Sequence, residues 1–402
     1  MGALSSIEEA AVERIDAAAM LAQVERWAAI NSGSRNLPGL ARMAGELASA
    51  FGVLPGDLSS LDPAPAEQVR ADGAAEPLDH GRNLLLTVRP DAPVQLLFTG
   101  HYDTVYGADH PFQASGWKEP GVLGGPGVAD MKGGIAVMLA ALQAVEAVGC
   151  NGLGYQVVLN ADEEVGSPGS ATLIAEAARG KMAALTYEPA ALPDGTLAGA
   201  RPGSGNFSLA VRGRSAHAGR NPEDGRNALV AAADLALRLA AARSPGLSVN
   251  PARIDGGGPN NVVPDGAVLR VNLRPSTLSD QARAEAAINA AVAAVAAEHE
   301  VTVAVHGGFG RPPKPIDGRA QTLFELVRDA GADLGQTIGW QDSGGVCDGN
   351  NIAACGVPVV DTMGVRGGAI HSPEEYLIVD SLAERAALSA VTILRLANGA
   401  LG

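Results

Sequence analysis

The strongest constraint on the fold is an alternation of short β-rich runs with alanine-rich helical segments over residues 83–189. The β-rich runs are "NLLLTV" (83–88), "VQLLFTG" (94–100), "GYQVVLNAD" (154–162) and "MAALTYEP" (182–189), with helical segments such as 133–149 and 169–180 between them. Strands that alternate with helices are typical of a layered α/β domain, because each connecting helix packs back onto the sheet. The sequence therefore predicts an α/β domain whose sheet is at least partly parallel.

The pattern changes after about residue 203. The next hundred residues read as strand, helix, strand, helix and strand, which suits a compact α+β module on an antiparallel sheet. A proline-rich segment at 310–318 is predicted to be the exit linker of this module, and an α/β pattern then returns. We therefore predict a module at 204–312 that is inserted into a domain built from residues 1–203 and 313–402.

Charge and cysteine content exclude several classes of partner and site. The chain has 402 residues and a formal net charge of −15, and its acidic excess is scattered along the sequence. Such a surface repels nucleic acid and anionic membranes, so we expect neither as a partner, whereas metal cations are attracted. The three cysteines, Cys150, Cys347 and Cys355, have no paired spacing, so neither a disulfide framework nor a cysteine-based zinc site is expected.

The start of the chain carries apolar and charged residues at helical spacing over residues 5–31, which predicts one amphipathic helix there. The same stretch lacks the basic and apolar regions of a signal peptide. We also expect no apolar run that reaches the ~20 residues required to span a membrane. A cytoplasmic location is therefore expected.

Three adjacent carboxylates follow one of the apolar runs, in "LNADEEVGSPGS" (159–170). Asp162, Glu163 and Glu164 repel one another, and burial raises the pKa of a carboxyl group unless a cation keeps it ionised. An isolated pair of this kind is usually a solvated loop. Adjacent residues at a strand end point in different directions, however, so one carboxylate can bind a metal while its neighbour faces a reacting water.

The other candidate residues are His101 and Asp103 in "GHYDTV", Asp130 in "GVADMKGG", Glu188 in "YEP" and His371 in "HSPEEY". Each residue alone is more often structural; an aspartate before a helix, for example, is most often an N-cap. As a set they lie at strand-to-loop junctions, where α/β sheets place their active sites. Two imidazoles and three carboxylates exceed the four ligands of one tetrahedral zinc. Two ions about 3.5–4 Å apart that share one carboxylate would account for the number.

Seven motifs occur in a characteristic order: "GHYDTV", "GVADMKGG", "ADEEVGSPGS", "YEP", "GRSAHAG", "NNVVP" and "HSPEEY". In these motifs the chain resembles the co-catalytic zinc hydrolases that include carboxypeptidase G, acetylornithine deacetylase, succinyl-diaminopimelate desuccinylase and the aminoacylases, and the carboxypeptidase G type most of all. The resemblance covers essentially the whole chain. It implies a layered mixed sheet with helices on both faces, together with an inserted ferredoxin-like domain through which two subunits form a homodimer.

The resemblance also implies a metal centre with two zinc ions per subunit, for which cobalt or manganese are alternatives. Asp130 is then the carboxylate that bridges the ions, and a cis peptide bond follows it. Glu163 is the implied general base, and Asp103 orients a ligand histidine. One histidine and one glutamate belong to each ion, so that the implied metal ligands are His101, Asp130, Glu164, Glu188 and His371.

The inserted module is implied to complete the active site. His217 resembles a histidine that reaches into the other subunit's site and stabilises the tetrahedral oxyanion. Asn261 is expected to hold the substrate carbonyl, and Arg274 to form a bidentate pair with its α-carboxylate. Gly345 belongs to the glycine-rich substrate loop "GGVCDGN" (344–350), in which Cys347 stands where relatives more often have Ser or Thr.

These residues predict a metallopeptidase or amidohydrolase that cleaves an amide bond beside a free α-carboxylate, and that releases C-terminal glutamate or a similar amino acid from a small peptide or N-acyl substrate. The alternative is an N-acyl-amino-acid deacylase, because the same metals and carboxylate clamp serve both reactions. A metal-free binding protein is a third hypothesis, which the complete ligand set disfavours. We expect the pocket for the substrate side chain to be formed around Arg274, Cys347 and Arg366.

Overall fold

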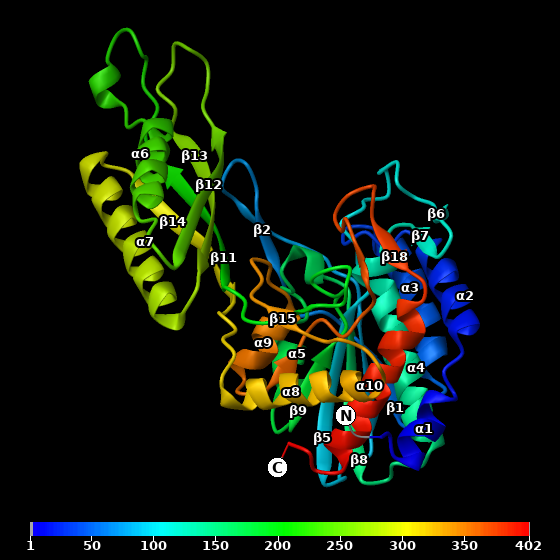
Figure 1. The fold of residues 1–402 in the computed structure, drawn as a ribbon. Helices are drawn as coiled ribbons and strands as arrows, with labels where there is room; N and C mark the ends of the chain where they lie inside the picture. The colour runs from blue at the N-terminus through cyan, green and yellow to red at the C-terminus, as the bar shows by residue number, and fades with distance from the viewer. Residues whose placement is uncertain (1–2, 402) are drawn as a thin grey trace.

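The computed structural model describes residues 3–401 and shows two bodies (Figure 1). The larger body is built on a six-stranded sheet with the order β1-β4-β8-β5-β9-β16. Its strands are β1 (Asp57–Leu61), β4 (Asn83–Val88), β5 (Val94–His101), β8 (Leu153–Asn160), β9 (Ala183–Thr186) and β16 (Val359–Val360). Strands β8, β5, β9 and β16 are parallel, whereas β1 and β4 pair antiparallel. The predicted mixed sheet is confirmed.

Helices cover both faces of this sheet because its central strands are apolar on both sides. Along β5, Leu96 and Phe98 belong to one core, whereas Leu97 packs in a second core on the opposite face. The first core includes α1 (Ser6–Val12), α2 (Ala17–Ala28), α3 (Leu37–Phe51), α4 (Gly134–Ala147), α8 (Gly318–Asp333) and α10 (Ser381–Ala397). The second includes α5 (Ala171–Ala178) and α9 (Asp348–Ala354). The predicted layered α/β arrangement is therefore confirmed.

The start of the chain forms two helices, α1 and α2, so the prediction of one continuous helix over residues 5–31 is wrong. Helix α1 ends with Glu13 as its C-cap. Asp16 then begins α2, because its side chain accepts a hydrogen bond from Ala19 N at 3.0 Å. An aspartate in this position satisfies a free N–H group and stabilises a new helix start.

The segment η1 (Val128–Gly133) leads directly into α4, and the combined stretch is long and apolar enough to cross a membrane. The expectation that no run reaches this length is therefore wrong. The structure buries 89% of the apolar window inside the molecule, where α4 packs against the sheet and α10. A helix that is apolar all round is typical of the centre of a large core.

The smaller body is an antiparallel four-stranded sheet with the order β12-β13-β11-β14. In chain order it contains β11 (Ser204–Arg212), α6 (Ala228–Ala241), β12 (Leu247–Gly256), β13 (Gly266–Pro275), α7 (Leu278–Glu298) and β14 (Thr302–Arg311). This β-α-β-β-α-β order is the ferredoxin-like arrangement that the family resemblance implied. It corrects the predicted order of strand, helix, strand, helix and strand, which lacked β12; this edge strand buries few of its side chains and so has no continuous apolar run. Alternate residues of β11 pack with α6 and α7 in a core that is separate from those of the larger body. The dimerisation role of this body stays a prediction.

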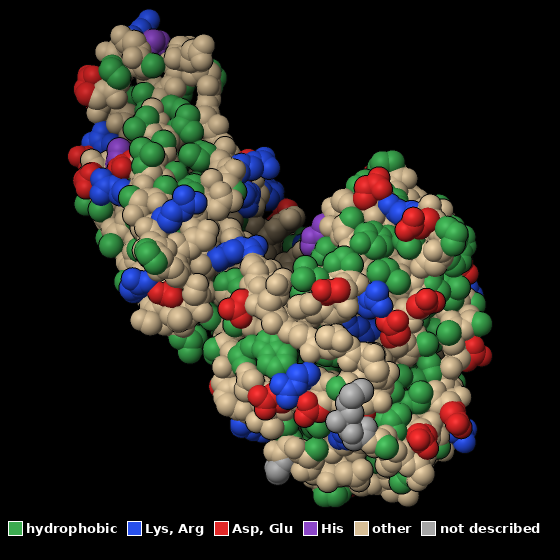
Figure 2. All heavy atoms as spheres, in the orientation of Figure 1, with side chains coloured by type: hydrophobic (Ala, Val, Ile, Leu, Met, Phe, Trp, Pro, Cys, Tyr) green, Lys and Arg blue, Asp and Glu red, His purple; other side chains and the backbone are tan. Residues whose placement is uncertain are grey.

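Two segments and a hairpin join the bodies. The chain enters the smaller body through residues 199–203 and leaves it through residues 312–317. Between these segments the backbones of Arg201 and Lys314 exchange two hydrogen bonds of 2.9 Å. The hairpin of β2 (Glu67–Val69) and β3 (Ala75–Pro77) also contacts the smaller sheet, where Arg270 Nη2 donates to Val69 O at 2.7 Å. Figure 2 shows a hollow between the bodies, with Lys and Arg side chains on the wall of the smaller body.

A further four-stranded sheet, with the order β17-β18-β7-β6, lies on the larger body across from the smaller one (Figure 1). Its strands are β6 (Gly116–Glu119), β7 (Val122–Gly124), β17 (Gly367–Gly368) and β18 (Tyr376–Ile378). Two short strands, β10 (Leu197–Ala198) and β15 (Trp340–Gln341), also pair. The four-stranded sheet brings the chain near residue 120 beside the chain near residue 370, which is more than 200 residues later.

Candidate metal centre

The candidate residues converge at the carboxyl ends of the parallel strands. Strand β5 ends at His101, β8 is followed by η2 (Glu163–Val165), and Glu188 lies two residues after β9. Parallel strands end on the same edge of a sheet, so the residues that follow them meet there. Asp130 reaches this edge from η1, and His371 reaches it from the loop between β17 and β18.

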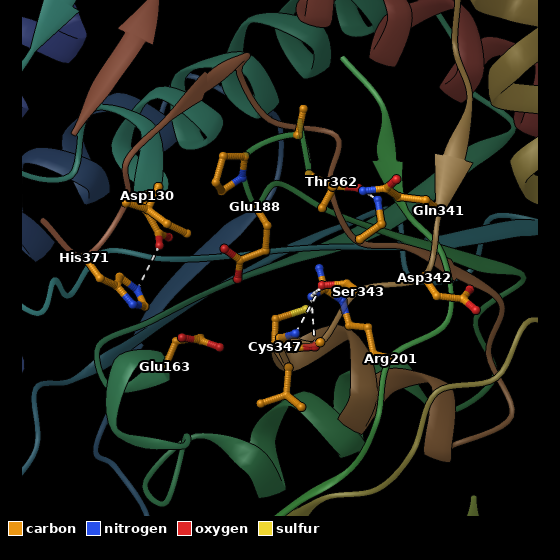
Figure 3. A pocket seen from close by; sticks show the side chains of 18 residues that line it. Asp130, Glu163, Glu188, Arg201, Gln341, Asp342, Ser343, Cys347, Thr362 and His371 are labelled. Atoms are coloured by element: carbon orange, nitrogen blue, oxygen red, sulfur yellow. Dashed lines mark hydrogen bonds and ion pairs between the residues drawn. The ribbon is translucent and has the colours of Figure 1, made fainter. Parts of the chain in front are cut away.

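Asp130 lies between two histidines. Its Oδ1 atom is 3.0 Å from His101 Nε2, and its Oδ2 atom is 3.2 Å from His371 Nε2. Figure 3 shows the contact with His371. The peptide bond between Asp130 and Met131 is cis, as the family resemblance implied. A carboxylate that presents each oxygen to a different imidazole has the geometry of a ligand shared by two ions.

Each histidine has a further carboxylate beside it. His371 Nε2 is 3.1 Å from Glu164 Oε2, and His101 Nε2 is 3.6 Å from Glu188 Oε2. Two groups of three residues have ligand atoms within 4.8 Å of one another and could hold a metal ion; one is His101, Asp130 and Glu164, and the other is His101, Glu188 and the predicted base Glu163. The structure thus brings all five predicted ligands together. Imidazole and carboxylate are groups that zinc and similar divalent ions bind.

Asp103 is buried and connects the histidine to the acidic pair. Its backbone oxygen and its Oδ1 atom lie 3.1 and 3.3 Å from His101 Nδ1, which fixes the orientation of that imidazole. Its carboxylate accepts hydrogen bonds from Glu163 N at 3.1 Å and Glu164 N at 3.2 Å. Ser34 Oγ donates a further bond at 2.7 Å. This geometry suits the orienting role that was predicted for Asp103.

The carboxylates of the cluster need a positive charge to remain ionised. Burial, together with repulsion from Asp130, raises the pKa of Glu164 to about 8. Burial also raises the pKa of Glu188 to about 8, although His101 opposes the shift. For Asp130 the effect of burial is outweighed by hydrogen bonds from the two histidines, which lower its pKa. A divalent cation would offset the repulsion, so the residues present fit a bound metal.

Glu163, the predicted general base, forms an ion pair with Arg311. Arg311 Nη1 donates to Glu163 Oε1, and Arg311 Nη2 donates to Glu163 O at 2.9 Å and to Ser167 Oγ at 3.0 Å. Burial raises the pKa of the Glu163 carboxyl group, and the guanidinium of Arg311 opposes that shift. Arg311 was not predicted from the sequence, because it lies in the segment predicted as a linker. Its place at the end of β14 brings it to the cluster.

The cluster opens into a cavity of about 380 Å³. Residues 341–347, from the last residue of β15 onward, face the cluster across this cavity (Figure 3), and Gly345 and the free, buried Cys347 are among them. Arg201 also lines the cavity and donates from Nη1 to Gly345 O at 3.2 Å; the sequence analysis missed it. The wall opposite the loop carries four residues of the cluster, Asp130, Glu163, Glu188 and His371.

Arg274 lies at the rim of this cavity rather than inside it. From β13 it donates from Nη1 to Gly344 O at 2.9 Å and from Nε to Asn272 Oδ1 at 3.1 Å. It lines an open groove that shares Gly344 with the cavity. Arg366 does not line the cavity, because its guanidinium pairs with Glu384 at 2.8 Å. The prediction that Arg366 surrounds the substrate pocket is wrong.

His217 and Asn261 lie together on the smaller body, away from the cluster. His217 forms an isolated β-bridge with Val262, and Ala218 N donates to Asn261 O at 3.0 Å. Both residues are exposed, and neither lines the cavity. One chain therefore does not bring these two residues to the metal centre, and their predicted roles require a second copy.

These residues and their order match a known family. The pattern of Peptidase family M20/M25/M40 matches residues 97–395, a span that contains every predicted ligand and the whole smaller body. The chain belongs to this family. It is accordingly a metal-dependent peptidase or amidohydrolase.

Two relatives of this M20/M25/M40 peptidase differ in the activity that they are named for. Carboxypeptidase G2 of Pseudomonas sp. (strain RS-16) is 32% identical over 329 residues, which cover 79% of this chain and 78% of the relative. Succinyl-diaminopimelate desuccinylase of Xanthomonas euvesicatoria pv. vesicatoria (strain 85-10) is 30% identical over 375 residues, which cover 87% and 97%.

The fold is also seen in solved structures of the family. The YXEP protein of Bacillus subtilis, described as a dinuclear metal binding peptidase from the M20 family, has a TM-score of 0.65 to this chain. The two are 15% identical, and the match covers 94% of this chain and 98% of that protein. At this identity the comparison shows that the M20/M25/M40 fold is shared.

Proposed function

We propose that this chain is a two-metal hydrolase that cleaves an amide bond beside a free α-carboxylate, in the manner that the name of its relative carboxypeptidase G2 indicates. The observation that carries the proposal is the position of Asp130, whose two oxygens face His101 and His371 in the same cavity as Glu163. Zinc is the proposed ion, with cobalt and manganese as alternatives. The proposed ligands are Asp130 and the four residues around it, His101, Glu164, Glu188 and His371.

The proposed hydrolysis depends on the groups that would surround the amide carbonyl of the substrate. Two divalent ions held by the cluster would polarise the substrate carbonyl and lower the pKa of a water. Glu163 accepts the proton of the attacking water and passes it to the leaving nitrogen. Arg311 holds Glu163 Oε1, and no residue within the described range 3–401 donates to Oε2, so this oxygen is free to face the water.

The residues at the rim would recognise the substrate. A guanidinium binds a carboxylate through two parallel N–H bonds, and Arg274 stands where the cavity opens toward the smaller body. His217 and Asn261 would be supplied by a second copy of the chain, so we propose that the active form is a homodimer. In it, His217 would donate to the carbonyl oxygen as negative charge develops there.

The test is a substrate panel with a variant of the proposed base. Purified protein loaded with zinc or cobalt is expected to hydrolyse one or more of a set of dipeptides, N-acyl amino acids and folate-like glutamates. Glu163→Ala is expected to retain both ions by elemental analysis and to lose about 10²–10⁴-fold in kcat, because proton transfer by a positioned side chain supplies that much. Failure to hydrolyse any member of the panel would refute the proposal.

A second candidate function is removal of an acyl group from an N-acyl amino acid. It is favoured by the desuccinylase relative, since the match covers 97% of that protein. The two functions differ in which side of the amide bond is recognised. Specificity constants for acetyl-amino and succinyl-amino acids, compared with those for aryl-glutamates, decide between them. A higher kcat/KM for the acyl-amino acids would select the deacylase.

A further inference from the structure

The motif "HSPEEY" contains two adjacent glutamates, and the proposed function uses neither of them. The side chain of Glu374 is 80% exposed and pairs with Lys118 at 2.6 Å on the surface. Glu375, in contrast, is only 1% exposed. A buried carboxylate is costly unless hydrogen bonds satisfy its oxygens. The partners of Glu375 therefore show what it does.

Glu375 is bound by the loop that carries Asp130. Its Oε1 atom accepts hydrogen bonds from Ala129 N and Asp130 N, both at 3.0 Å. Its Oε2 atom is 3.2 Å from Gly127 N and 2.9 Å from Tyr106 Oη. Three of these four donors are backbone N–H groups of one short loop, an arrangement that forms an anion-binding concavity. The carboxylate therefore holds the backbone on which the shared ligand stands.

The loop is shaped for this contact. Gly127 has φ +76°, in the left-handed region that glycine adopts without a steric penalty. A Cβ atom at this position would lie 2.9 Å from Thr104 Cγ2, so no larger residue fits without a shift. The N–H groups that face Glu375 are thus held by a backbone conformation that depends on glycine.

The backbone of Glu375, in contrast to its side chain, is connected to His371 through a tight turn. Glu375 N donates to Ser372 O at 3.0 Å, and Ser372 Oγ donates to Ala369 O at 2.7 Å. The hydroxyl of Tyr106 lies 2.8 Å from Ser372 O as well as near Glu375. His371 has φ +61°, which a residue other than glycine keeps only where its surroundings hold it. The turn is therefore a stiff link between the two residues.

We propose that Glu375 is a positioning residue, which fixes the Asp130 loop and the His371 turn at one separation and so sets the affinity for the ion that those two ligands share. The inference rests on the proposed metal centre. Asp130 Oδ2 and His371 Nε2 are 3.2 Å apart but come from segments about 240 residues apart in sequence, and Glu375 is hydrogen-bonded to both segments. Residues that orient the ligands of a metal typically change its affinity by about 10–100-fold when they are replaced.

Replacing Glu375 should lower the affinity for one ion more than the affinity for the other. His101 ends β5, a central strand of the large sheet, and is held by Asp103 rather than by Glu375. The ion on the His101 side therefore keeps one rigid histidine when Glu375 is replaced, whereas the ion on the His371 side loses the link that holds its histidine against Asp130. A general loss of stability would weaken both ions together.

The adjacent glutamates supply a matched pair of variants. Glu375→Gln keeps the size of the side chain but turns an N–H group toward the N–H of Gly127, whereas Glu374→Gln makes the same change at the surface. Zinc affinities are measured by competition with a chromophoric chelator, and the cobalt-loaded proteins are compared by their absorption spectra. In Glu375→Gln we expect the zinc affinity of the site that contains His371 to fall by about 10–100-fold and that of the other site to fall by much less. Excess zinc should restore most of kcat. Glu374→Gln should match the wild type.

The outcomes are distinguishable. If the wild-type protein binds fewer than two ions, the proposed function fails; if it binds two and Glu375→Gln binds them equally well, only the positioning role is overturned. Equal weakening of both ions would also overturn it. Should Glu375→Gln fail to fold by circular dichroism, Tyr106→Phe decides, because it removes the hydroxyl between Glu375 and Ser372. A severalfold loss of zinc affinity at one of the two sites alone supports the proposal, and unchanged affinities refute it.

Discussion

Arg311 is the charged side chain that most directly affects the proposed base. Its guanidinium is buried and holds both the carboxylate and the backbone oxygen of Glu163. Burial favours the protonated form of this glutamate, and the positive charge of Arg311 favours the ionised form. The protonation state of Glu163 is therefore a balance that one substitution can shift.

Replacing Arg311 by methionine is expected to raise the pKa of Glu163. Glu163 must be ionised to accept a proton, so the acid limb of the pH profile of kcat/KM should move to higher pH. Arg311→Lys retains the charge and should move the limb less. An unchanged acid limb in Arg311→Met would show that Glu163 does not control it. The pH profile of the zinc-loaded enzyme is the measurement.

Among the elements, the two segments that join the bodies are anchored on one carboxylate that follows β16. Arg201 donates from Nε and Nη2 to Asp361 at 2.8 and 3.0 Å, and Lys314 Nζ lies 3.0 Å from the same carboxylate. All three side chains are buried. Burial by itself would raise the pKa of Asp361, but the two cations outweigh it and lower the pKa to about 2.

Asp361→Asn is expected to leave two buried cations without a counter-charge and to lower the free energy of unfolding by about 3–5 kcal/mol. The pKa of about 2 in the folded state lies below the value of about 3.9 in the unfolded chain, so the contribution of Asp361 is complete above about pH 5 and is lost as the pH falls toward 2. Urea unfolding should therefore show a constant difference from the wild type between about pH 5 and 9 and a smaller one below about pH 4.

Asp62→Asn is the control for this measurement, because Asp62 pairs with Arg82 on the surface, where its side chain is 80% exposed. It should leave stability nearly unchanged. A comparable loss in both variants would show that the buried pairs do not anchor the connection.

In the whole molecule, the proposed active site is divided between two bodies with separate cores. His217 and Asn261 lie on the smaller body and do not reach the cluster of their own chain. The same body exposes large apolar side chains on α6, with Val230 52% and Leu237 72% exposed. Exposed apolar surface of this kind is a candidate contact for a second copy.

A mixing experiment tests whether His217 acts on the other subunit. His217→Ala and Glu163→Ala should each be nearly inactive alone. After mixing and subunit exchange, half of the dimers are mixed, and one of their two sites has both an intact base and an intact histidine. Roughly a quarter of the wild-type activity should therefore return, as the symmetry of a two-fold dimer requires. No recovery, with exchange verified by mass, would mean that His217 acts within its own chain or not at all.

The sequence alone was sufficient to identify Asp130 and the four other residues that gather around it, together with the mixed sheet that positions them. Few residue types bind metal ions, so short motifs can reveal candidate ligands. Parallel strands bring the residues that follow them to one edge of the sheet, so the same motifs also indicate which candidates lie close together. For the smaller body, the alternation of elements predicted three strands and missed β12, so its ferredoxin-like order was implied only by the family resemblance. The helix break at Asp16 was missed because one capping hydrogen bond does not change the hydrophobic spacing.

Only the tertiary structure showed what holds these residues. Arg311 was hidden in a predicted linker, and Arg201 lay outside the seven motifs. Glu375 stood within "HSPEEY", but nothing in the sequence distinguished it from the adjacent Glu374. Their partners lie about 150–250 residues away in the chain. Hydrophobic periodicity and short motifs contain information about residues that are close in sequence. A buried ion pair, in contrast, depends on which segments the tertiary structure packs against each other. The sequence motifs therefore determined which side chains can bind metal or transfer a proton. The packing of segments that are distant in sequence decided which charged side chains surround them.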